Sequence, residues 1–341
     1  MPVPLLYIGT NLQPPGTKWD ELCFPHLLNA SCRKPPQRPA ENVFIFMVLC
    51  LLSVLTVTLN LLVIISVSHF RQLHTPTNLL LLSLAVSDFL IGFFVMPIRI
   101  LLTEGCWVLG TFMCGLFNFA SFTLTSVSVG HMVLISADRY VAICDPLRYP
   151  TKVTLRRVQV CVCLCWAASV FYNGVILKDF LEDPDKYNLC LGECLLLIDY
   201  ITGAFDVVIT FFGPIIVIVV LYMRVFVVAV SQARAMRSHI VSVQSSAHLS
   251  VKKSELKAAA ALGVVVFLFL VCLCPYFYPN IVGLTFKSSD FLAVLGTWLF
   301  HSNSCLNPVI YAFFYPWFRK SLKSIVTLQI LQPDSSDANI L

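Results

Sequence analysis

The sequence predicts an all-α membrane protein, a seven-transmembrane helix bundle followed by a short amphipathic cytoplasmic helix. Of its 341 residues, 58% are hydrophobic and only 12% are charged, against about 25% charged residues in an ordinary soluble domain. The apolar residues gather in seven runs, each near the length of about 20 residues that a helix needs to cross a bilayer. Membrane β-barrels use shorter, alternating segments and usually an even number of strands, so the runs indicate helices.

The seven predicted spans follow one another along most of the chain. They cover residues 43–68, 77–102, 112–143, 157–177, 200–229, 258–284 and 290–313. The first run begins too far along the chain for a secretory signal peptide, so we expect the first helix to direct the chain to the membrane. After the seventh run, residues 316–325 interleave apolar and basic side chains at helical spacing. This pattern predicts a helix that lies on the inner leaflet, in contact with lipid.

Positively charged residues lie in the connections on one side of the predicted bundle. Short cytoplasmic loops carry an excess of Lys and Arg, and here they follow the first, third, fifth and seventh spans, whereas the other connections are acidic. We therefore expect a multi-pass protein with an extracellular N-terminal tail over 1–42, and with the amphipathic helix and a cytoplasmic tail over 316–341. The formal net charge of +5 mostly reflects this bias, so no nucleic-acid partner is expected.

Polar side chains interrupt the apolar runs, and at bilayer depth such residues are costly and usually functional. In the third span they recur every three or four residues, which places them on one helical face that we expect to point into the bundle. Prolines inside four of the spans each remove an intrahelical hydrogen bond and predict kinks. The polar residues are Asn60, Asp88, Asn118, Ser121, Thr125, Ser128, Asp206, Thr210, His301, Asn303, Ser304 and Asn307, and the prolines are Pro97, Pro214, Pro275 and Pro308.

Six cysteines lie outside the spans or near their outer ends, namely Cys23, Cys32, Cys106, Cys114, Cys190 and Cys194. The extracellular side is oxidising, so these residues can form disulfides, but sequence alone does not fix the pairs. The outer tail also contains the N-glycosylation motif that begins at Asn29, in a position that agrees with the predicted orientation.

Two short motifs carry a resemblance to a known family. Asp138-Arg139-Tyr140 ends the third span, and the seventh span contains Asn307-Pro308-Val309-Ile310-Tyr311. With Asn60, Asp88, Trp107, Cys114, Trp166, Pro214 and Pro275, each in its expected position, they resemble rhodopsin-like G-protein-coupled receptors over about residues 43–325. Residues 303–318 and the cysteine-rich cluster 190–194 are similar to the narrower group of trace amine-associated receptors. Most of these are olfactory, and a large set occurs in fish.

The resemblance implies a receptor domain over 43–315 that resides in the plasma membrane, binds a small-molecule amine and activates a heterotrimeric G protein of the stimulatory or olfactory type. It also implies that Cys114 bridges to Cys194, and that Cys190 bridges to the N-terminal tail through Cys23 or Cys32. An enzyme is not expected, because no Gly-rich phosphate loop, metal-spaced Cys/His cluster or nucleophile motif is present. A transporter or channel is disfavoured, since neither an internal repeat nor a selectivity filter is visible.

The predicted ligand site departs from that of aminergic receptors. Those receptors hold the ligand ammonium with an aspartate in the third span, eighteen residues before the arginine that corresponds to Arg139, and here that position is Ser121. A neutral hydroxyl cannot neutralise a buried cation. Asp206 lies eight residues before Pro214 in the fifth span, and some fish trace amine-associated receptors look like this. The resemblance therefore implies an ammonium held at Asp206 by a charge-assisted hydrogen bond.

Other roles for Asp206 stay open at this point. It can pair within the protein with Arg99 or His301, or remain protonated, and the receptor then takes a non-amine ligand. A ligand with two amines is also compatible, with an outer-loop acid as the second partner. The resemblance implies further contacts. They are aromatic residues at positions where the family lines its cavity, which suit a cation and an apolar tail or form ordinary core, and polar residues near them. They are Phe122, Tyr276, Phe277 and Trp298, with Ser121, Thr125, Thr210 and His301.

The inner ends of the spans carry the residues of the expected switch. The resemblance implies an ion pair that holds the inactive state, between Arg139 and Glu255, which lies twenty residues before Pro275. The alternative is that Arg139 simply extends toward water. Leu273 stands where the family often has a tryptophan. Opening of the bundle would expose Arg139 to the G protein, and the further switch residues are Asp138, Tyr140, Tyr222, Asn307, Pro308 and Tyr311.

A second polar group lies deeper in the predicted bundle. Asp88, Ser128, Asn303 and Ser304, with Asn307 near, match the inner sodium site of the same family. Sodium is a hard cation and suits oxygen ligands, as calcium does, so the resemblance implies an allosteric sodium ion. The alternative is a hydrogen-bond network that holds water and no ion. No other cofactor is expected.

Overall fold

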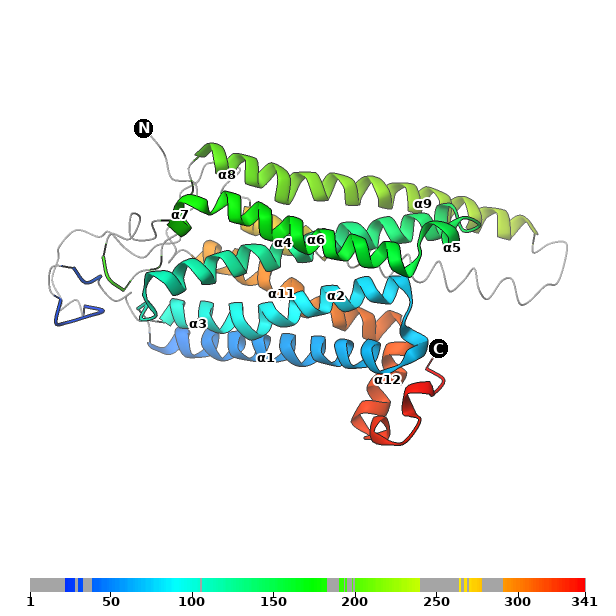
Figure 1. The fold of residues 1–341 in the computed structure, drawn as a ribbon, viewed down its shortest axis with the longest axis horizontal. Helices are drawn as coiled ribbons and strands as arrows, with labels where there is room; N and C mark the ends of the chain where they lie inside the picture. The colour runs from blue at the N-terminus through cyan, green and yellow to red at the C-terminus, as the bar shows by residue number, and fades with distance from the viewer. Residues whose placement is uncertain are drawn as a thin grey trace.

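The computed structural model of the protein describes residues 22–27, 30–32, 39–104, 106–182, 190–192, 194, 198, 200–239, 264, 267–268, 270–277 and 291–340. Its bundle helices are α1 (Pro39–His69), α2 (Pro76–Leu90), α3 (Met96–Glu104), α4 (Gly110–Cys144), α6 (Leu155–Ile176), α8 (Tyr200–Val207), α9 (Gly213–His239) and α11 (Phe291–Phe314). These helices run along one common axis (Figure 1). Shorter helices are η1 (Arg71–Leu73), α5 (Tyr149–Lys152), α7 (Lys178–Glu182) and α12 (Pro316–Val326).

The helices coincide with the predicted spans. Within the described residues, five helical stretches are long and apolar enough to cross a membrane: Phe46–His69, Pro76–Leu102, Gly110–Cys144, Leu155–Ile176 and Ile201–Val228. They match the first five predicted spans, and α11 covers the seventh. Residues 270–277 are helical and belong to the sixth span, most of which lies outside the described residues. The expected all-α membrane bundle is confirmed.

Helix α4 lies at the centre of the bundle, where it packs against α2, α6 and α9, while α1 packs against α2 and α11. Large apolar side chains on the outside, such as Phe171 and Phe226, are 74% and 64% exposed. In water such a surface would be unfavourable, but lipid tails solvate it. The buried side chains near the axis include many polar ones, so the bundle is apolar outside and partly polar within.

Two of the helices contain a wide turn just before a proline. The five-residue π-helical turn η2 (Ile91–Val95) precedes Pro97, and η4 (Val208–Phe212) precedes Pro214. Proline has no N–H to donate to the preceding turn, and a π turn is a common way to interrupt the regular ladder at such a point. Arg99 follows the first wide turn and Asp206 precedes the second. The prolines thereby shape the walls of the cavity described below.

Three disulfides tie together the outer ends of the described segments. They join Cys114 to Cys194, Cys32 to Cys190 and Cys23 to Cys106. The first is the pair that the family resemblance implies, and the second selects Cys32 as the partner of Cys190. The third pair was not indicated by the sequence. Together they link Cys23 and Cys32 near the N-terminus, and Cys190 and Cys194 after α7, to Cys106 and to Cys114 on α4.

Helix α12 turns away from the bundle axis at the end where α5 lies (Figure 1). Its Trp317 and Phe318 are buried against the bundle, whereas Arg319 and Lys320 are exposed. This division matches the amphipathic helix that the sequence predicts for the inner leaflet. The following tail folds back onto the connection after α1, where Asp337 lies 3.4 Å from Arg71.

Candidate functional site

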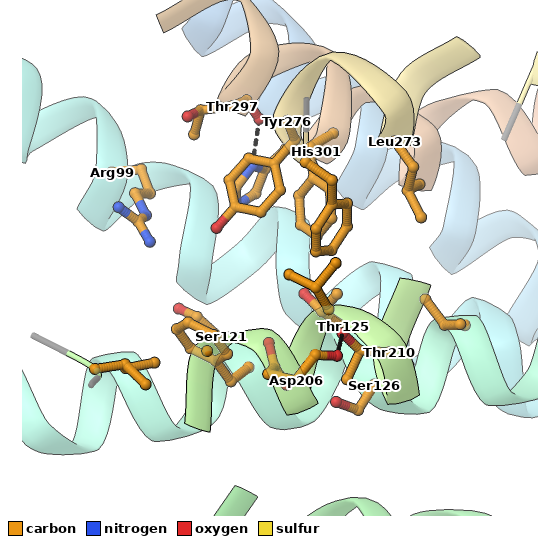
Figure 2. A pocket seen from close by; sticks show the side chains of 17 residues that line it. Arg99, Ser121, Thr125, Ser126, Asp206, Thr210, Leu273, Tyr276, Thr297 and His301 are labelled. Atoms are coloured by element: carbon orange, nitrogen blue, oxygen red, sulfur yellow. Dashed lines mark hydrogen bonds between the residues drawn. The ribbon is translucent and has the colours of Figure 1, made fainter. Parts of the chain in front are cut away.

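A cavity of about 70 Å³ lies among α3, α4, α8, α11 and residues 270–277. A single water needs only about 10–15 Å³ of such space, so the cavity is large enough for a small organic molecule. Of the nine residues predicted to contact the ligand, eight line it: Ser121, Phe122, Thr125, Asp206, Thr210, Tyr276, Phe277 and His301. Figure 2 shows the polar members of this set facing the same space.

Trp298 departs from the prediction. It is 7% exposed and belongs to a separate apolar cluster with Trp107 and Phe117, so it supports the cavity wall from behind instead of lining it. Phe300, which was not among the expected contacts, lines the cavity instead of Trp298. Its ring stacks on Tyr276 with centroids 4.5 Å apart. Phe300 lies two residues after Trp298 on α11, so its side chain points to the other side of the helix.

Among the described residues, the side-chain partners of Asp206 are uncharged hydroxyl groups. Its Oδ1 accepts a hydrogen bond from the hydroxyl of Tyr172 on α6 at 2.9 Å, while its backbone carbonyl accepts one from Thr210 at 2.7 Å. Neither of the pairings considered from the sequence is present among the described contacts. His301 bonds instead to the carbonyl of Thr297 at 2.7 Å, and Arg99 forms no ion pair with any described residue.

The part of the wall that α4 forms carries no charge. The Ser121 hydroxyl is uncharged and donates to the carbonyl of Phe117, one turn earlier in the same helix, at 2.7 Å. Of the described residues that line the cavity, Asp206 is the only acid and Arg99 the only permanent cation. Aromatic rings complete the enclosure, where Phe277 packs on Phe211 with centroids 4.5 Å apart. The cavity can therefore hold a cation beside Asp206 with an apolar body against the rings.

The second polar group lies around Asp88, whose side chain is fully buried. Its two carboxylate oxygens accept hydrogen bonds from Ser128 at 3.2 Å and Asn307 at 2.8 Å. Asn60 donates to the backbone carbonyl of Ser304 at 2.9 Å, and Asn303 is also buried there. Within the described part of the chain, the side-chain oxygens of Asn60 and Asn307 have no hydrogen-bond partner. The group combines a carboxyl with several other side-chain oxygens, a set that suits a hard cation.

At the cytoplasmic end, the carboxylate of Asp138 accepts hydrogen bonds from three residues. Thr77 donates to Oδ2 at 2.9 Å, Tyr149 donates to Oδ1 at 2.8 Å, and the neighbouring Arg139 forms an ion pair through Nε at 2.9 Å. A terminal nitrogen of Arg139 also bonds to Thr77. Burial raises the pKa of the Tyr149 phenol above its ordinary value, so this group stays neutral and donates at physiological pH. Arg139 is therefore held inside the bundle and not extended into water.

The remaining switch residues surround this network, as far as the structure describes them. Tyr140 and Tyr222 are half-buried, Tyr311 is buried beside Tyr315 with ring centroids 5.9 Å apart, and Pro308 lies inside α11. Glu255 and the glycosylation position Asn29 lie outside the described residues. The ion pair expected between Arg139 and Glu255 therefore stays a prediction, while the local pair with Asp138 is present.

Comparison with known proteins identifies similar chains. Residues 59–311 match the family described as 7 transmembrane receptor (rhodopsin family). The chain is 39% identical over 328 residues to trace amine-associated receptor 13c of Danio rerio, an alignment that covers 94% of this chain and 96% of that protein. It is 38% identical to trace amine-associated receptor 8c of Mus musculus, with the same coverage, and 36% identical to trace amine-associated receptor 6 of Pan troglodytes, over 94% and 95% of the two chains.

Proposed function

Because the chain belongs to the rhodopsin family of seven-transmembrane receptors, and within it to the trace amine-associated receptors, we propose that its ligand is an amine whose ammonium binds at Asp206. The family consists of multi-pass plasma-membrane receptors that act on G proteins and are not enzymes. The observation that carries the proposal is the position of Asp206 and the absence of a described cation beside it. Asp206 faces the cavity, and its side-chain partners among the described residues are uncharged hydroxyls.

A carboxylate in this position is costly unless a cation joins it. One hydrogen bond from Tyr172 orients the group but does not balance its charge, and taking a carboxylate out of water costs several kcal/mol, on the order of what a good ion pair returns. A ligand ammonium would supply that charge through a short, charge-assisted hydrogen bond. Tyr276 and Phe277 would contact the apolar part of the ligand.

The proposed signalling step begins at this cavity and ends at Arg139. An agonist shifts the receptor toward an open form only if it binds that form more tightly. Opening would break the contacts of Arg139 with Asp138 and Thr77 and present its guanidinium to a heterotrimeric G protein. We propose the stimulatory or olfactory type, and a role in sensing odorous amines. Both rest on the resemblance of the sequence to trace amine-associated receptors and not on the geometry.

Cells that express the receptor with a cAMP reporter test the proposal. The panel contains primary amines, diamines and neutral isosteres in which a hydroxyl or methyl group replaces the ammonium. Amines should activate at concentrations at least about 100-fold below those of their isosteres, which corresponds to about 3 kcal/mol for a desolvated charge pair. Isosteres that activate as well as the amines would refute the amine assignment, although the receptor family would stand.

The second candidate is a receptor of the same family for a non-amine ligand, with Asp206 structural. The hydrogen bond from Tyr172 is the observation in its favour, since it joins α6 to α8 whether or not a ligand is present. In that case replacement of Asp206 should lower the amount of receptor at the cell surface, and the potency of every ligand should change equally.

We further infer that the group around Asp88 holds a sodium ion. Asp88 and Ser128 would supply oxygen ligands, and the unpartnered oxygen of Asn307 gives a third. The ion would supply the positive charge that this buried carboxylate lacks. Replacing external sodium by choline should then raise agonist potency severalfold, because an ion bound to the closed arrangement opposes opening. Asp88→Asn should remove this salt dependence, whereas a wild-type receptor that does not respond to sodium would favour the water network.

A further inference from the structure

Arg99 stands out as a charged residue with no assigned role. It lies on α3, two residues after Pro97, and lines the same cavity as Asp206. Its guanidinium carbon sits 5.2 Å from the centre of the Phe117 ring. Figure 2 shows Arg99 and Asp206 entering from different sides, with the Tyr276 hydroxyl directed into the space between them. The Tyr276 hydroxyl is close enough to interact electrostatically with both Arg99 and Asp206.

No described group balances the charge of Arg99. Its Nε is buried and has no hydrogen-bond partner, and no carboxylate in the described ranges forms an ion pair with it. Asp206 is directed to Tyr172 instead. Arginine stays protonated inside proteins, and the attraction to one phenylalanine ring offsets only part of the cost of burying it. The guanidinium is thus available to an anion that enters the cavity.

We propose that the cavity binds an amine that also carries a carboxylate, with the carboxylate paired to Arg99 and the ammonium to Asp206. This inference rests on the proposed role of Asp206 and narrows its ligand class. A carboxylate matches the planar fork of a guanidinium with two parallel hydrogen bonds. One acid and one base on the walls suit a ligand with no net charge.

The neutral α4 wall supports the same ligand class. With Ser121 at the position where aminergic receptors carry an aspartate, no second acid on that wall repels a ligand carboxylate. The hydroxyl of Ser121 donates to the carbonyl of Phe117, and its oxygen carries no charge that could balance the ammonium. A diamine would find only one acid among the described lining residues and would bring its second ammonium near Arg99. The charge distribution therefore favours an aminocarboxylate over a diamine.

The test uses matched ligands on the wild-type receptor with a cAMP reporter. Straight-chain ω-aminocarboxylates of several lengths are compared with the carboxamide of each and with the plain alkylamine. At the best length, the carboxylate should be about 10- to 100-fold more potent than its carboxamide, as expected for hydrogen bonds to a charged group. Equal potency of carboxylate and carboxamide at every length would overturn the inference without any variant being needed.

The Arg99→Met variant then tests whether Arg99 causes the preference for the carboxylate over the carboxamide. Arg99→Lys is the matched variant that keeps the positive charge. Arg99→Met should bring the aminocarboxylate to the potency of the carboxamide and leave the carboxamide unchanged, and Arg99→Lys should retain part of the preference. An equal loss for both ligands in Arg99→Met would refute the pairing. Asp206→Asn separates this inference from the proposed function: if it silences plain amines while the carboxylate gives no advantage, only the inference fails.

Discussion

Asp206→Asn is expected to lower the potency of an activating amine by about 100-fold or more, with the receptor still at the cell surface. The amide keeps the shape of the side chain and can still accept from Tyr172 at Oδ1, so the α6–α8 contact survives. What disappears is the negative charge. Leaving an ammonium without its partner in a partly desolvated cavity costs about 3 kcal/mol or more, which is the predicted loss of potency.

Two control variants separate ligand binding from structure in this experiment. Tyr172→Phe removes the bond that orients Asp206 and should cost about tenfold, the value of one hydrogen bond to a charged group. Ser121→Ala should have little effect, because its hydroxyl bonds only to the carbonyl of Phe117 among the described groups. If Ser121→Ala abolishes the response and Asp206→Asn does not, the ammonium lies on α4 and the assignment is wrong.

Arg139→Ala is expected to abolish the cAMP response while ligand binding at the outer cavity persists. In the described arrangement Arg139 is held by Asp138 and Thr77, and we expect it to contact the G protein once released. Asp138→Asn should act in the opposite direction. Loss of a partly buried ion pair worth about 1 kcal/mol raises the population of the open form, and hence ligand-free activity, about fivefold.

Tyr149→Phe is the matched test of this inner network. It removes one of the donors to Asp138 without changing any charge, so basal activity should rise less than in Asp138→Asn. Basal cAMP is measured at equal surface levels for all variants. A fall in basal activity in Asp138→Asn, with Arg139 intact, would contradict the view that this pair holds the closed form.

The sequence was sufficient for the helical spans because their signal is strong and local. A run of about 20 apolar residues has few other folds available, and the ends of α4 and α6 lie within a few residues of those predicted. The wide turns η2 and η4 were not predicted. A proline predicts an interruption, but whether the chain kinks or widens there depends on neighbouring helices that the local sequence does not specify.

Helical spacing predicted the polar face of α4 that includes Ser121 and Thr125, because residues three or four apart share a face. The aromatic wall and Asp206 were expected from the family resemblance. Trp298 was misplaced, since α11 lies rotated so that Phe300 and His301 face the cavity. Tyr172 was missed because its partner is 34 residues away in the sequence, on another helix. The Cys23–Cys106 disulfide is similarly non-local, with a separation of 83 residues, and cysteine spacing carries no information about such a pair.

The most direct test of the account compares one activating amine with its neutral isostere on the wild-type receptor and on Asp206→Asn, at matched surface levels. The account predicts that the substitution costs the amine about 100-fold or more and leaves the isostere nearly unchanged, because only the amine uses the charge of Asp206. An equal loss for both ligands would show that Asp206 holds the fold and not the ligand, and would contradict the central claim.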